Sequence, residues 1–490
     1  MSKPSENDKK EGFSSSLGFL LSAVAAAVGL SNIWRFSAET AQYGGFIYVF
    51  FYLICIVAIG YPIVLAELAF GRTKQQGLYE SYQGYGRWKW LGSLAAIICF
   101  FIFCFYNVVA GWVVGYVGKT LSGTLIDKNQ AGDPTFFSGT FEALKGNMLT
   151  NFICTFIMLI GAVFINQAGV SGGIEKCAKI LMPIFLVMMI ALIGYSCILE
   201  GASKGISFYL KPKLDHVSFK AFVCALSQSF MSLSIGMGAL VTYGAYVNKQ
   251  DNLHKSSLVI VLGDTLVALC AGFFLFAFLG HIDFNFKAFT NPEIAKENPE
   301  LATNPTGLAF ITLPLIFSKI GGIVGTLLAL SFFLLLIFAA ITSSISLLEV
   351  PTTYLVSAYK IKRKHAIWLL AGCSYLISTF CILADSNCEH LWTIMPNPAE
   401  TNFRVFFEKF VLMILTPFAT FYFILFIGHK FKLENVFKES TGERAPNKFF
   451  MNYIRITVKY IAPVLVGFSF LYSSLDMIFG VDKVYTALFG

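Results

Sequence analysis

Residues 20–45 read LLSAVAAAVGLSNIWRFSAETAQYGG, an apolar run that AVGLSN (27–32) interrupts in its middle, just before Trp34 and Arg35. A second interruption, SLSIGMGAL at 232–240, places one glycine on each side of Met237 within another apolar run. Two glycines so close cost a helix about 2 kcal/mol relative to alanine, and the neighbouring serines offer competing hydrogen bonds. Both helices are therefore predicted to unwind at these points.

The composition is that of a membrane protein. Of the 490 residues, 56% are hydrophobic and 13% charged, with a mean hydropathy of +0.69, whereas about a quarter of the residues of a soluble domain are charged. A membrane span needs about 20 mostly apolar residues. We expect an all-α polytopic membrane protein with eleven transmembrane helices, at roughly 15–40, 45–70, 91–122, 149–166, 177–199, 219–246, 257–280, 322–357, 365–384, 403–428 and 453–479.

These spans are expected to form one membrane domain, residues 15–479, between a polar segment at 1–14 and a short tail at 480–490. The longest outer connection, 281–320, begins with a polar insertion and ends in LAFITLPLIFSKIGG. That ending is apolar enough to re-enter the protein as a short lid helix.

Basic residues gather in alternate loops, notably at 72–89 and 430–448. Positive charge marks the cytoplasmic loops of membrane proteins, so we expect a cytoplasmic N-terminus and, with an odd number of spans, an outer C-terminus. The lysines at 204–213 oppose this orientation. The same placement accounts for the formal charge of +8 without a nucleic-acid partner.

The two interruptions occupy corresponding positions, the first and sixth spans of two five-helix halves. Paired interruptions of this kind indicate a ligand site near the middle of the membrane. Freed backbone carbonyls there could bind Na⁺, and freed N–H groups at helix N-termini could bind a carboxylate. The alternative is that the glycines only let helices pack closely.

Ionisable side chains inside spans are costly and mark functional positions. Asp264 lies in LVIVLGDTLVALCAG with nothing basic within a turn, so it needs a cation, a proton or a distant partner. The alternative is a carboxylate satisfied by hydrogen bonds between helices. Glu67 is expected to accept N–H groups that an unwound neighbour exposes, and the role of Glu349 stays open.

Neutral oxygens accompany these acids within the spans. Alkali cations prefer such hard ligands, although a hydroxyl in a membrane helix usually bonds its own backbone. The residues concerned are Asn32, Ser232, Thr342, Ser343 and Ser344.

Five segments in order resemble the neurotransmitter:sodium symporters, particularly their bacterial amino-acid branch, over essentially the whole chain. They are LLSAVAAAVGLSNIWRFSAETAQYGG, GVSGGIEKCAKILMP, SQSFMSLSIGMGALVTYGAYV, LAFITLPLIFSK and AAITSSISLLEVP. The resemblance implies the leucine-transporter fold, a 5+5 inverted repeat with broken helices 1 and 6. Repeat one would cover about 15–199, repeat two about 219–428, and an extra helix about 453–479.

The resemblance also implies two sodium ions. The first would be held by the carbonyl of Ala27, the side chains of Asn32, Ser232 and Asp264, and the substrate carboxylate. The second would be held by the carbonyls of Ala25, Val28 and Ala339 and by the hydroxyls of Thr342 and Ser343.

For the substrate, the resemblance implies a carboxylate site at the N–H groups of Leu30 and Ser31 and the hydroxyl of Tyr106. The substrate amine would meet carbonyls around Ala27, Met231 and Ser232, with Ser234 nearby. Ile102, Met237, Met231 and Leu347 would line a roomy apolar pocket for a large hydrophobic or aromatic amino acid.

Two departures from the family pattern bear on the chemistry. Position 264 is often Asn in the family, and chloride-dependent members balance the sodium charge with an anion. Asp264 supplies that charge covalently, so we expect chloride independence. Position 29 is Gly where monoamine carriers have Asp, which favours a substrate with its own carboxylate.

The resemblance places gates on both sides of the site. The outer gate would pair Arg35 with Glu408, or alternatively with Glu400. On the inner side Lys10 matches the family's basic gate residue, but the acid expected near the end of the eighth span is missing, with Ser357 among the residues there instead.

We therefore expect sodium-coupled uptake of an amino acid by alternating access in a prokaryotic plasma (cell inner) membrane, with two Na⁺ and no organic cofactor. The alternative is an amino-acid-binding receptor or regulatory membrane protein that does not transport. A channel is disfavoured because no filter-like carbonyl loop occurs. An enzyme is disfavoured because HExxH, GxSxG and P-loop motifs are absent. The oligomeric state and the particular amino acid stay open.

Overall fold

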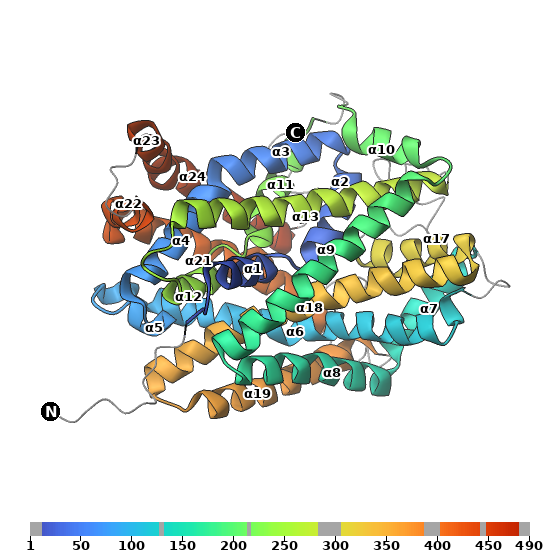
Figure 1. Ribbon diagram of the computed structural model, residues 1–490, viewed down its shortest axis with the longest axis horizontal. Helices are drawn as coiled ribbons and strands as arrows, with labels where there is room; N and C mark the ends of the chain where they lie inside the picture. The colour runs from blue at the N-terminus through green and yellow to red at the C-terminus, as the bar shows by residue number, and fades with distance from the viewer. Residues whose placement is uncertain are drawn as a thin grey trace.

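The computed structural model describes residues 12–126, 132–212, 217–282, 305–386, 402–441 and 447–479. Within this part of the chain the regular structure is entirely helical. The long helices α6 (Trp90–Leu121), α13 (Leu253–His281) and α18 (Gly322–Tyr359) lie roughly along the same axis, with α18 antiparallel to the other two (Figure 1), and α6 packs against α18.

Among the described residues, nine helices are long and apolar enough to cross a membrane. They comprise Phe46–Lys74, Gly86–Leu121, Met148–Gln167, Val170–Cys197, Leu253–His281, Gly322–Tyr359, Arg363–Asp385, Phe403–Phe431 and Lys448–Leu475. A tenth is a bent pair, Ser16–Ala27 with Ser31–Gln42, whose halves meet at 57°.

The predicted sixth span, 219–246, is split into α11 (Phe219–Ser232) and α12 (Ala239–Ala245). Each half is too short to span a bilayer alone. The expected eleven spans are consistent with these helices when the two halves are taken together, and both expected breaks are confirmed.

Shorter helices cover the two ends of the bundle. In Figure 1, α5 (Leu78–Ser81) and α22 (Leu433–Thr441) lie at the left end, near α23 (Lys448–Ile456), the start of the last span, and α7 (Pro134–Gly146) and α17 (Leu313–Ile320) lie at the right end. Another short helix, α10 (Ala202–Leu210), packs against α13.

The expected lid is a short apolar helix, Pro305–Ile320, that ends in α17. Phe310 of this helix is fully buried, and its carbonyl accepts a hydrogen bond of 2.7 Å from the hydroxyl of Tyr116. Its ring lies 5.5 Å from that of Trp34, next to the first break. The lid thus packs against the half of the first span that follows the break.

Glycine lets α12 approach α4 (Tyr61–Lys74) at backbone distance. A Cβ atom on Gly71 would lie 2.0 Å from the carbonyl oxygen of Val241, and one on Gly244 would lie 2.6 Å from that of Leu68. Small residues permit such contacts between membrane helices. The short half-helix α12 is therefore held firmly on the second span.

Candidate functional site

The first break separates α1 (Ser16–Ala27) from the turn that begins at Ser31. Val28 has an extended conformation, with φ −66° and ψ 109°. The N–H of Gly29, which a continuous helix would direct at the carbonyl of Ala25, donates instead to Oδ1 of Asn32 at 3.0 Å. The break is thus stabilised by the Asn32 side chain, and helical pairing of the nearby carbonyls is lost.

The second break runs from the end of α11 to the start of α12. Ser234, Gly236 and Gly238 all have positive φ, at 53°, 80° and 76°. At Gly236 a side chain is also excluded by space, because a Cβ atom would lie 2.1 Å from Oγ1 of Thr420. The exposed N–H of Gly236 donates to Oε1 of Glu67 at 2.7 Å. The expectation that Glu67 accepts an N–H group from an unwound neighbour is confirmed.

A buried polar cluster joins the two breaks. Nδ2 of Asn32 lies 2.7 Å from Oδ1 of Asp264 and 2.8 Å from Oγ of Ser232, and the Ser232 hydroxyl donates to Oδ2 of Asp264 at 2.5 Å. All three side chains are 0% exposed. The hydroxyl of Tyr52 reaches Ser232 at 3.2 Å. Three segments far apart in the sequence therefore meet at one carboxylate.

Asp264 has capacity for a cation. In the described part of the chain the side chains that contact its carboxylate are the neutral Asn32 and Ser232. An ionised carboxylate offers about four lone-pair positions, so these two donors leave room for another partner. The amide nitrogen of Asn32 and the hydroxyl of Ser232 donate to the carboxylate and are both neutral, so among the described residues its negative charge is not balanced by a cationic side chain. A carboxylate oxygen is a hard ligand that suits an alkali cation. The described residues contain no group of three or more His, Cys, Asp or Glu that would suit a transition metal.

A second group of oxygens lies where α18 passes the first break. The hydroxyl of Ser343 donates to the carbonyl of Val28 at 3.2 Å. The hydroxyl of Thr342 bonds the carbonyls of Phe338 and Ala339 at 2.9 and 3.1 Å. The back-bonding that the sequence left as an alternative therefore occurs at Thr342, while Ser343 reaches across to α1. The Ala25 side chain packs against α9 (Lys176–Cys197).

A cavity of about 130 Å³ lies between the two breaks. The N–H of Leu30 faces the hydroxyl of Tyr106 there at 3.4 Å. Ser232 is set behind the wall, in the carboxylate cluster. The other predicted substrate residues all line the cavity: Ala27, Leu30, Ser31, Ile102, Tyr106, Met231, Ser234, Met237 and Leu347.

The sequence analysis missed other residues of the cavity wall. Phe105 and Val109 line it together with Ile102 and Tyr106. These four positions follow the i, i+3, i+4, i+7 pattern of one helix face. Phe105 and Val109 could therefore have been predicted from Ile102 and Tyr106. Trp34 and Leu412 also line the cavity. Trp34 is four residues after Leu30 and Leu412 is four residues after Glu408, so the same helical spacing could have found them.

Charged residues also line this cavity, at the positions predicted for the outer gate. Arg35 and Glu408 both line it, but each is bonded to a neighbour on its own helix. Nε of Arg35 lies 2.8 Å from Oε1 of Glu39, and Oε2 of Glu408 lies 2.8 Å from Nη1 of Arg404. Arg404 is held in turn by Asp385 at 2.5 Å. The predicted gate partners thus face one cavity without pairing in this conformation, and Glu400 lies outside the described residues.

Lys10, predicted as the basic residue of the inner gate, also lies outside the described residues. The Ser357 hydroxyl donates to the carbonyl of Tyr354 at 3.2 Å. Glu349, whose role the sequence left open, forms a buried bidentate pair with Arg363 at 2.6 and 2.9 Å. It also accepts a hydrogen bond of 3.0 Å from Tyr246. Glu349 therefore joins α18 to the start of α19 (Arg363–Asp385) and to the end of α12.

Comparisons with known proteins agree on one family. A model of the sodium:neurotransmitter symporter family matches residues 10–132 and 140–486. The chain is 27% identical to YhdH, an uncharacterized sodium-dependent transporter of Bacillus subtilis, over 94% of this chain and 96% of the relative. It is 29% identical to an uncharacterized sodium-dependent transporter of Haemophilus influenzae, over 94% and 97% respectively. The crystal structure of MhsT in complex with L-phenylalanine superposes with a TM-score of 0.81 at 31% identity, covering 94% of this chain and 99% of that one.

The bond between Glu67 and Gly236 makes a testable prediction about the second break. Glu67→Ala leaves the buried N–H of Gly236 without its acceptor, which costs about 1–3 kcal/mol. Glu67→Gln keeps an oxygen at the same place and removes only the charge. We expect thermal unfolding in detergent to show a clearly lower midpoint for the Ala variant than for the Gln variant. Equal midpoints would show that this bond does not support the break.

Proposed function

Because the chain belongs to the sodium:neurotransmitter symporter family, we propose that it takes up an amino acid by alternating access, driven by sodium. The family consists of secondary transporters, so the protein is a multi-pass membrane protein and not an enzyme. We place it in the plasma (cell inner) membrane with a cytoplasmic N-terminus, because basic residues are concentrated in the loops on that side.

The observation that carries the proposal is the buried cluster of Asn32, Ser232 and Asp264 beside the cavity. A sodium ion here would be held by these side chains, the carbonyl of Ala27 and the carboxylate of the substrate. An uncompensated buried carboxylate is costly, and a bound cation removes that cost. A sodium ion at this cluster would therefore stabilise the two broken helices in their joined arrangement.

A second sodium ion would lie between α1 and α18. Its ligands would be the carbonyls of Ala25, Val28 and Ala339 with the hydroxyls of Thr342 and Ser343. The contact between Ser343 and the carbonyl of Val28 supports this assignment, since it shows that the two segments approach closely. This ion would stabilise contact between the first half-helix and the eighth span.

The substrate carboxylate would meet the N–H groups of Leu30 and Ser31 and the hydroxyl of Tyr106, which already faces Leu30. The amine would meet carbonyls around Ala27 and Met231. Because the carboxylate also coordinates the first sodium ion, ion and substrate bind the same closed state. Each then raises the affinity for the other by the same factor.

The cavity supports a large hydrophobic or aromatic substrate. Its wall includes Ile102, Met231, Met237 and Leu347, and its volume is about 130 Å³. An apolar cavity of about 150 Å³ accommodates a benzene molecule, so one aromatic ring is close to the size that fits. The similarity to a structure that contains L-phenylalanine points the same way.

Closure on the outer side would bring Arg35 and Glu408 together over the substrate. Arg35 would leave Glu39, and Glu408 would turn away from Arg404. Both side chains already line the cavity, so closure requires new side-chain positions together with a modest approach of the first and tenth spans.

The first test is sodium-dependent uptake of labelled tyrosine, tryptophan or leucine into proteoliposomes, with the unlabelled amino acids as competitors. We expect accumulation with sodium and little without it, and stronger competition by aromatic amino acids than by small ones. Sodium-dependent binding without accumulation would support the receptor alternative and contradict transport.

The second test replaces chloride with gluconate in the same uptake assay. Asp264 carries the negative charge that balances the first sodium ion, so we expect uptake at an unchanged rate. Loss of uptake in gluconate would show that an anion from solution is still needed and that Asp264 does not supply this charge.

A further inference from the structure

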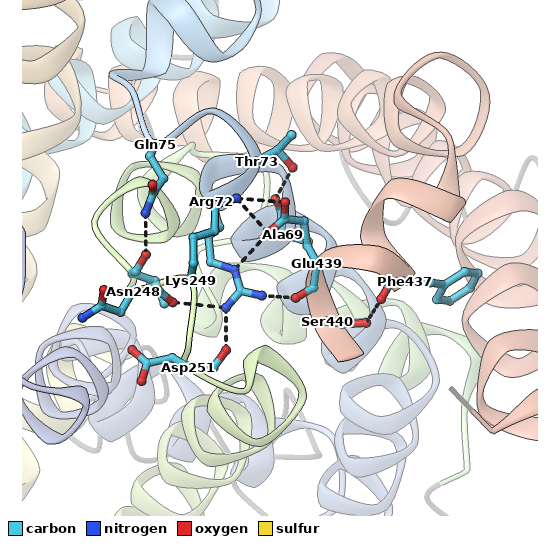
Figure 2. A network of polar contacts seen from close by, with 11 residues as sticks. Ala69, Arg72, Thr73, Gln75, Asn248, Lys249, Asp251, Phe437, Glu439 and Ser440 are labelled. Carbon is cyan, nitrogen blue, oxygen red and sulfur yellow. Dashed lines mark hydrogen bonds and ion pairs between the residues drawn. The ribbon is translucent and has the colours of Figure 1, made fainter. Parts of the chain in front are cut away.

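Arg72, in the last turn of α4, joins three segments at the end of the bundle where α1 begins (Figure 2). Its Nε donates to Oε2 of Glu439 at 3.1 Å, and its Nη2 donates to the backbone carbonyl of Glu439. Its Nη1 donates to the carbonyls of Asn248, at 3.3 Å, and Asp251. The side chain is only 3% exposed, so these contacts lie in a largely dry environment.

Glu439 belongs to α22, the amphipathic helix between the tenth and eleventh spans. Leu433, Val436 and Phe437 are buried, and the helix packs against α4 and α13. The carboxylate of Glu439 also meets Nζ of Lys249 at 2.9 and 3.1 Å. One carboxylate on α22 therefore holds two cations that come from different segments.

The contacts of Arg72, Glu439 and Lys249 form a joint, and this joint also reaches both half-helices that leave the candidate site toward this end. Residues 248–251 follow α12, and Arg72 holds two of their carbonyls. The side chain of Asp251 accepts a hydrogen bond from the hydroxyl of Ser16, the first residue of α1. The first residue of α1 and the last turn of α4 are thus linked through the loop at residues 248–251. Lys249 of the same loop pairs with Glu439 and so links the loop to α22.

This arrangement matters because α1 and α12 lead from the cavity to the contacts around Arg72. Ala27, at the end of α1, and Ala239, at the start of α12, line the cavity, whereas Ser16, at the other end of α1, and residues 248–251, beyond the other end of α12, belong to these contacts. Release toward that end requires these half-helices to part from their neighbours. Removing the partner of a buried charge is strongly unfavourable, so the joint opposes such a movement.

The expected inner gate lacks its acid, since Ser357 is neutral. We propose that Arg72 and Glu439 form the inner latch of this transporter, so that α22, a helix outside the ten-helix repeat, controls release on the predicted cytoplasmic side. The inference rests on the proposed function for its consequence, transport, but the latch itself is a property of the fold that can be measured separately.

Hydrogen–deuterium exchange of the full chain in nanodiscs tests the latch directly, because exchange reports local opening. The variant is Glu439→Gln, and the matched control is Glu434→Gln on the same helix, whose side chain is 69% exposed. In sodium buffer without substrate, we expect Glu439→Gln to speed exchange at 433–441 and 16–27 by about tenfold, as a shifted equilibrium predicts. The control should stay within about twofold of the wild type.

Lys249→Gln provides a milder variant if Glu439→Gln does not fold. Lys249 is 48% exposed and its loss leaves the contact between Arg72 and Glu439 in place. We expect a smaller increase in exchange at 433–441, about threefold. Exchange equal to that of the wild type in the latch variants, or equal increases in the latch variant and the Glu434→Gln control, would overturn the proposal.

Uptake of labelled L-phenylalanine distinguishes failure of the latch from failure of the proposed transport function. If the wild type shows sodium-dependent uptake, the latch predicts that Glu439→Gln weakens the apparent affinity for sodium by about tenfold, because the inner-closed state is less populated. Equal sodium dependence in both proteins would overturn the latch. If the wild type takes up neither L-phenylalanine nor labelled tyrosine, tryptophan or leucine, the proposed function fails, while the exchange results still decide whether Arg72 and Glu439 hold this end shut.

Discussion

Three side chains, Asn32, Ser232 and Asp264, meet in a fully buried cluster where two helices have lost their regular hydrogen bonds. Each break exposes backbone groups that must find partners in an environment without water. Asn32 satisfies part of the first break through Gly29 and simultaneously binds Asp264. The geometry of the first break, the position of α11 and the environment of the seventh span are therefore coupled through one carboxylate.

The second break depends on a different acid. Glu67 accepts the N–H of Gly236 from the second span, while the glycines at 71 and 244 bring α12 against that span at backbone distance. The half-helix α12 is thus fixed on one side by backbone packing, and the loop that follows it is fixed by Arg72. The central residues of the break, such as Ser234 and Met237, line the cavity instead. They are the part of this segment that would face a ligand.

The breaks were predictable from the sequence because glycine and serine within apolar runs have strong local effects. The partners of the predicted gate residues Arg35 and Glu408 were predictable in part, because Glu39 and Arg404 are each four residues away on the same helix and such pairs interact. The other partner of Arg404, Asp385, ends the preceding span and has no local signal.

The joint around Arg72 shows the same limit. Arg72 and Glu439 are 367 positions apart, and a basic residue at the end of a span looks locally like any charge that orients a membrane protein. Pairings between distant segments are set by tertiary packing, which no short motif encodes. The residues that the family resemblance assigned to the substrate, except Ser232, line one cavity, and their role in binding stays a prediction. Only neighbours on one helix face, such as Ile102 and Tyr106 on α6, could be grouped from local spacing.

In the proposed mechanism Asp264 couples sodium to the substrate. This coupling is tested most directly by equilibrium binding of the best-competing amino acid, titrated with sodium, in the wild type, in Asp264→Asn and in Glu142→Gln, a control whose side chain is 63% exposed. The account predicts that sodium strengthens binding in the wild type and the control, and that Asp264→Asn needs at least about tenfold more sodium or loses the dependence. Superimposable sodium titrations for Asp264→Asn and the wild type would contradict it.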